Sequence, residues 1–126
     1  MGEHLLGRVN TRMVRMALAL CGGLGGTFEE MCGALSGGAL VVGDFLGPRR
    51  PGGDEKPMRE TIARYRQRFL DEIGPTKCAT LRDGLYGPNG KEPCNVLVQR
   101  AIRLLFEVLD ERKQDQGTSG HSLLDG

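Results

Sequence analysis

Apolar residues recur every three or four positions along most of the chain, a period that predicts helices rather than strands. A first helix is expected over residues 9–20, and the following GGLGG run brings it to an end. Thr27 and Glu30 have the spacing of a capping box, so we expect a second helix to begin there and to continue to Leu46. The apolar face of this helix comprises Phe28, Met31, Leu35, Ala39, Val42 and Leu46.

The second half of the chain has the same period. A helix is expected over residues 58–73, a short helical turn over 78–81, and a last helix over 93–113. The pattern predicts an all-α fold, a compact bundle of about four to five helices with a glycine-rich loop. The helical bundle is expected to form a single domain over residues 1–113, and the polar segment 114–126 is expected to be a disordered tail.

The charge is nearly balanced, with 17 Lys and Arg against 16 Asp and Glu. No overall attraction to nucleic acid or to an anionic membrane is therefore expected. The uncharged segment of residues 16–28 is too short and too rich in glycine to cross a bilayer. We expect no membrane insertion, and a cytoplasmic location.

Four glycines fall within the predicted second helix, at positions 33, 37, 38 and 43. Each costs about 1 kcal/mol relative to alanine in a helix, so something must offset the loss. The close approach of a neighbouring helix would do so, and so would a cofactor. Tight helix packing alone is the simpler of these explanations.

The four cysteines, Cys21, Cys32, Cys78 and Cys94, form no closely spaced pair. A zinc finger is therefore not expected, because its ligands normally come in such pairs. Nothing else in the sequence indicates secretion, so a metal cluster or reactive thiols are favoured over structural disulfides.

Two of these cysteines are expected at the starts of helices. Pro93 places Cys94 in a first turn, where free N–H groups and the helix dipole favour a thiolate. Lys91 and Lys77, which are near Cys94 and Cys78 in the sequence, favour it too.

The other two are expected beside the glycine-rich loop, with Cys32 one turn inside its helix and Cys21 at the end of another. The simplest alternative is that each cysteine is a small buried apolar residue, which the Ala and Leu context favours for Cys21.

The segment after GGLGG reads Cys32-Gly33-Ala34-Leu35-Ser36-Gly37. With Cys78 and Cys94 downstream, this pattern resembles the redox-active family named after its cysteines, C_GCAxxG_C_C, over about residues 12–110. The family's first cysteine lies well before the glycine stretch and has no counterpart here. Cys21 is at a position that usually carries an aromatic residue, so it either replaces that cysteine or is incidental.

The resemblance implies a redox role through an iron–sulfur cluster, [2Fe–2S] or related, that exchanges electrons with a partner protein. Cys32, Cys78 and Cys94, with Cys21, would be its ligands, and Gly33 and Gly37 would let it approach the helix. It defines no enzymatic reaction.

Two alternatives stay open. One is a thiol–disulfide protein in which two cysteines cycle between dithiol and disulfide. The other is a helical interaction module with packing cysteines. We also expect a homodimer, formed through the apolar face of residues 96–109.

Overall fold

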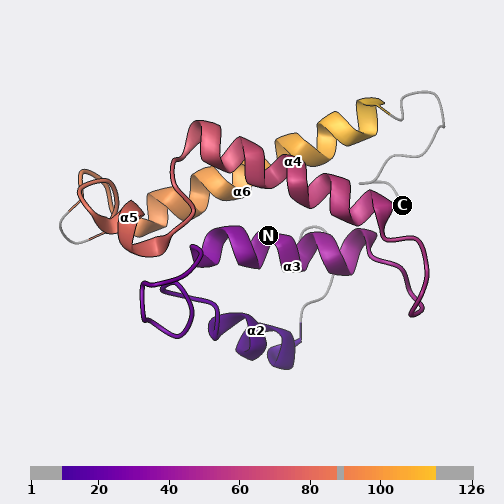
Figure 1. Cartoon of the computed structure of the whole chain (residues 1–126), viewed down its shortest axis with the longest axis horizontal. Coiled ribbons are helices and arrows are strands. Elements are labelled where there is room, and N and C mark those ends of the chain that lie inside the picture. The colour runs from indigo at the N-terminus through magenta and orange to yellow at the C-terminus, as the bar shows by residue number, and fades with distance from the viewer. Residues whose placement is uncertain (1–9, 88–89, 116–126) are drawn as a thin grey trace.

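The computed structural model describes residues 10–87 and 90–115. This part of the chain contains five helices and no strand, which confirms the predicted all-α fold (Figure 1). The helices are α2 (Thr11–Leu18), α3 (Gly33–Leu46), α4 (Lys56–Glu72), α5 (Cys78–Arg82) and α6 (Cys94–Asp115). The predicted tail, apart from the end of α6, lies outside the described residues.

The three long helices α3, α4 and α6 pack against one another in every pairing. Figure 1 shows them side by side, with α5 at the end of the bundle where α3 and α6 begin. Tyr65 and Phe69 of α4 are completely buried between the helices. The core around them comprises Leu35, Val42, Leu81, Leu97, Ala101, Leu104, Leu105, Val108 and Leu109.

The apolar face of α6 is covered within the chain, because Ala101, Leu105 and Val108 are completely buried against the neighbouring helices. The reason we gave for a homodimer is therefore wrong, since this face needs no second copy to cover it. Dimerisation itself stays a prediction.

Helix α2 is shorter than the predicted helix 9–20, and it buries none of its residues. Asn10 caps it by accepting a hydrogen bond from the Met13 backbone N–H. Met16, which we placed on an apolar side, is 68% exposed. The 3.6-residue period found a helix here, but it could not show whether another element covers the apolar side.

The capping box predicted at Thr27 and Glu30 is wrong, because α3 begins only at Gly33 and has Cys32 as its N-cap. The Thr27 hydroxyl donates to backbone carbonyls of the preceding turn, those of Gly23 and Leu24, at 2.8 and 2.9 Å. Phe28 then has φ = +62°, a conformation that no helix interior contains. The hydrogen bonds of the Thr27 hydroxyl to the turn therefore prevent a helix from starting at Thr27.

The arginine-rich face of α4 forms ion pairs, as expected for a solvated surface. Arg68 contacts carboxylates on two helices, Glu72 of α4 and both Glu107 and Glu111 of α6. Among the described helices, none combines the length and the hydropathy that a bilayer crossing needs.

Candidate functional site

Three cysteines lie at the beginnings of three helices. Cys32 is the N-cap of α3, Cys78 is the first residue of α5 and Cys94 is the first residue of α6. All three starts are at the same end of the bundle in Figure 1, although 62 positions separate Cys32 from Cys94. We call Cys32, Cys78 and Cys94 the cysteine group. Helix beginnings offer free N–H groups and a positive dipole end, both of which favour anions.

An antiparallel bridge between Met31 and Lys77 joins the chain before α3 to the chain before α5. Two backbone hydrogen bonds flank it: Cys32 N–H donates to Thr76 at 2.7 Å and Cys78 N–H to Glu30 at 2.9 Å. Side chains of extended backbone alternate between two faces, so Cys32 and Cys78 share the face opposite to Met31 and Lys77.

Burial agrees with this placement. Cys32 and Cys78 are each 9% exposed, whereas Met31 is 43% exposed. Diagonal neighbours across such a bridge have Cα atoms roughly 7–8 Å apart, at the upper limit for a disulfide. The bridge therefore brings two thiols together without joining them, and all four cysteines are free.

Burial raises the pKa of the Cys32 thiol, because the thiolate is poorly solvated there. The backbone N–H groups of Ala34 and Leu35 in the first turn of α3 oppose this effect. Negative charge on Cys78 or Cys94 raises the pKa of Cys32 further.

Burial also raises the pKa of Cys78. Two neighbours act in opposite directions: the Arg82 guanidinium lowers this pKa, and an ionised Cys94 raises it. Every pair within the cysteine group is therefore coupled electrostatically. Cys94 is the exposed member, and the other two are buried.

The glycine-rich turn lies directly against Cys78. Gly22, Gly23, Gly25 and Gly26 all have φ between 62° and 76°. A Cβ atom at Gly23 would lie 2.6 Å from the Cys78 Cβ and 2.9 Å from the Glu30 carbonyl oxygen. Only glycine gives the turn both this backbone conformation and this close approach.

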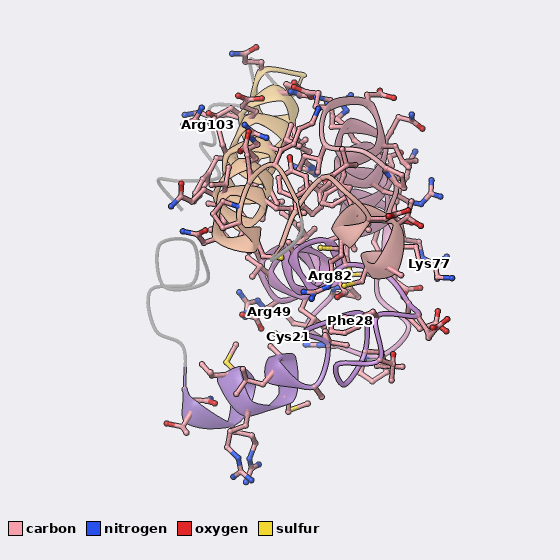
Figure 2. All side chains as sticks on the ribbon, turned by 90° about the vertical axis from the view of Figure 1, so that its left-hand side faces the viewer. Cys21, Phe28, Arg49, Lys77, Arg82 and Arg103 are labelled. Carbon is pink, nitrogen blue, oxygen red and sulfur yellow. The ribbon has the colours of Figure 1, made fainter. Side chains whose placement is uncertain are left out.

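Arg82 extends from α5 over the ring of Phe28, with its guanidinium carbon 4.2 Å from the ring centroid. Figure 2 looks onto this end of the bundle and shows Arg82 above Phe28, with sulfur atoms beside Arg82. A Cβ atom at Gly87 would lie 3.5 Å from Arg82 Nη1 and 3.6 Å from Cys94 Sγ. Arg82 therefore lies close to two members of the cysteine group.

Cys21 is exposed in the turn after α2. Its backbone contacts α3, because a Cβ atom at Gly33 would lie 3.1 Å from the Cys21 Cα. Gly33 thus allows a close backbone approach. A Cβ atom at Gly37 would meet nothing within 4 Å, and this glycine lines a shallow apolar groove between α3 and α6.

Helix packing accounts for one further glycine of α3. A Cβ atom at Gly38 would lie 2.6 Å from the Tyr65 ring, and the Tyr65 hydroxyl donates to the Ala34 carbonyl at 3.2 Å. This contact fixes the first turn of α3, and with it Cys32, against α4.

Sequence reasoning missed Arg82 and Phe28. It credited Lys77, but the Lys77 ammonium pairs with Glu29 at 3.7 Å, on the other face of the bridge. The signal for Arg82 was present, because residues four apart share one face of a helix and Arg82 follows Cys78 by four. No comparable signal identified Phe28, whose position depends on the turn.

Comparison with known families confirms the family resemblance of the sequence. The family model described as "Putative redox-active protein (C_GCAxxG_C_C)" matches residues 1–108. The chain belongs to this family. The matched range contains the cysteines at the starts of α3, α5 and α6. Neither the curated proteins nor the solved structures compared with the chain gave a match.

Proposed function

We propose that this member of the C_GCAxxG_C_C family is a thiol-based redox protein whose centre is the cysteine group. One observation carries the proposal. Three free thiols, distant in sequence, lie at the beginnings of three helices at one end of the bundle, and negative charge on one disfavours the thiolate of another. The proposed cycle is between the dithiol and the disulfide of Cys78 and Cys94.

The two cysteines have different roles in this cycle. Cys94 is exposed and can reach a disulfide of a partner protein, whereas Cys78 is buried. Arg82 lies close to both, and its charge favours the thiolate of Cys78. We therefore assign Cys94 as the attacking thiol and Cys78 as the resolving thiol.

The steps balance as an ordinary thiol–disulfide exchange. The Cys94 thiolate attacks a partner disulfide, a bond forms between Cys94 and one partner sulfur, and the other partner sulfur leaves as a thiolate. Cys78 then loses its proton to water and attacks the Cys94 sulfur, which releases the remaining partner sulfur. Two electrons pass from Cys78 and Cys94 to the partner disulfide.

Mixed-disulfide trapping tests these assignments. The reduced protein is mixed with oxidised glutathione, and its adducts are followed by mass spectrometry. We expect Cys78→Ser to accumulate a Cys94–glutathione adduct that the unmodified protein resolves, and Cys94→Ser to react far more slowly. Cys21→Ser serves as the control and should behave like the unmodified protein. Equal adduct levels in the Cys78→Ser variant and in the unmodified protein would contradict the resolving role.

An iron–sulfur cluster is the second candidate, and the donor set favours it, since thiolates are the usual ligands of such clusters. The arrangement does not yet fit one. In residues 10–87 and 90–115, no three His, Cys, Asp or Glu side chains are grouped so that they could hold a metal ion. Cys21, the expected fourth ligand, is exposed outside the cysteine group. Iron and acid-labile sulfide analysis after anaerobic purification decides between the candidates.

A further inference from the structure

The surroundings of Arg82 differ from those of the surface arginines that pair with carboxylates. Arg82 is half-buried with its guanidinium over the Phe28 ring, and among the described residues no carboxylate forms an ion pair with it. Other arginines of the chain pair with glutamates, such as Arg68 with Glu107 at 2.6 Å. An arginine without an acidic partner beside thiols leaves its charge available to a thiolate.

Phe28 is held in place from both sides. Its N–H donates to the Gly22 carbonyl at 2.8 Å, and its carbonyl accepts from the Ala79 N–H of α5, also at 2.8 Å. Its φ of +62° is costly for an aromatic residue, by about 1 kcal/mol. The turn maintains this conformation with the ring against Arg82, so the ring fixes where the guanidinium lies.

We propose that Arg82, held over Phe28, is the positioning residue of the redox site: it lies beside Cys94 and stabilises the thiolate of Cys78. The role of Arg82 in a redox site rests on the proposed function, but its electrostatic effect on the thiolate requires no redox partner. Cation–π contact limits the guanidinium to one side of the ring, where Cys94 Sγ lies near the same point as Nη1.

The charged and titratable groups around Cys78 come from each neighbouring element. They are Cys32 from the start of α3, Cys94 from the start of α6 and Arg82 from α5 itself. Lys77 and Glu29 form a pair on the opposite face of the bridge. Arg82 is thus the cation that acts on Cys78, and removing it leaves burial and the neighbouring thiols, which all disfavour the thiolate.

The test is the pH profile of alkylation by iodoacetamide, measured separately for the Cys78 and Cys94 peptides by mass spectrometry. Arg82→Gln should slow alkylation of Cys78 at neutral pH by about three- to tenfold, with its profile shifted to higher pH. Arg82→Lys keeps the charge and should restore part of the rate. Phe28→Leu keeps the arginine but removes the ring, so its profile should lie between those of Arg82→Gln and the unmodified protein.

Lys77→Gln is the matched control, because it removes a cation next to Cys78 in sequence but on the other face of the bridge. Its profile should overlie that of the unmodified protein. The proposal is overturned if Arg82→Gln leaves both profiles unchanged, or if Lys77→Gln shifts them equally. Should Arg82→Gln fail to fold, Arg82→Lys and Phe28→Leu decide: two unchanged profiles overturn the proposal. Alkylation requires no redox partner, so the alkylation profiles test the effect of Arg82 even if the proposed disulfide cycle is wrong.

Discussion

Replacement of Gly38 by alanine tests the packing that places Cys32. The new Cβ atom would lie 2.6 Å from Tyr65 Cε2 and 2.8 Å from the Tyr65 hydroxyl oxygen, where ordinary contacts begin at about 3.4 Å. Tyr65 is completely buried, so its ring has no room to withdraw freely. It would have to shift and weaken its hydrogen bond to the Ala34 carbonyl.

The expected cost follows from these contacts. Overpacking costs about 1–3 kcal/mol and the weakened hydrogen bond about 1 kcal/mol, while the gain in helix propensity returns about 1 kcal/mol. Gly38→Ala should therefore lower the free energy of unfolding by about 1–3 kcal/mol. Gly37→Ala is the matched control, since its Cβ atom meets nothing within 4 Å. It should raise the same free energy by about 0.5–1 kcal/mol.

Urea denaturation of the reduced variants, followed by circular dichroism, measures both changes. If Gly38→Ala proved as stable as Gly37→Ala, the described contact between α3 and α4 would be wrong. The position of Cys32 at the end of that contact would then lose its support.

Three further predictions concern stability. Gly23→Ala should destabilise the protein more than Gly25→Ala. Both glycines have positive φ, but only a Cβ atom at position 23 would collide with backbone atoms and with the Cys78 Cβ. Thermal unfolding compares the two variants, and equal melting temperatures would refute the contact. Because burial raises the pKa of Cys32 and Cys78, the folded protein keeps protons that the unfolded chain releases. The free energy of unfolding should fall as pH rises above about 8.5, and less so in Cys32→Ala Cys78→Ala; parallel curves from urea titrations would contradict this. Arg68→Met should cost about 1 kcal/mol at low salt and less at high salt, and a loss independent of salt in denaturation curves would refute the ion-pair network.

Much of the fold could be predicted because helical periodicity is a local signal. The predicted helix 58–73 corresponds to α4, and the turn at 78–81 corresponds to α5. The last helix also begins where Pro93 indicates, with Cys94 in its first turn. In each case proline or glycine marks the boundary directly in the sequence.

The beginning of α3 could not be predicted from its residues. Thr27 and Glu30 have the spacing of a cap, but the preceding glycines adopt positive φ and provide carbonyls that bind the Thr27 hydroxyl first. The cysteine group depends on the same turn, since the bridge between Met31 and Lys77 pairs segments far apart in sequence. Spacing alone identified the three thiols as candidates. It could not show that Arg82, rather than Lys77, faces them.

A redox titration with thiol mass spectrometry tests the cysteine group most directly. The protein is equilibrated in dithiothreitol buffers of graded potential, and its free thiols are alkylated and identified. We predict that Cys78 and Cys94 are oxidised together, as one internal disulfide with a single two-electron midpoint, while Cys21 stays free. Independent oxidation of Cys78 and Cys94 at separate potentials, or no disulfide between them at any potential, would contradict the proposed centre.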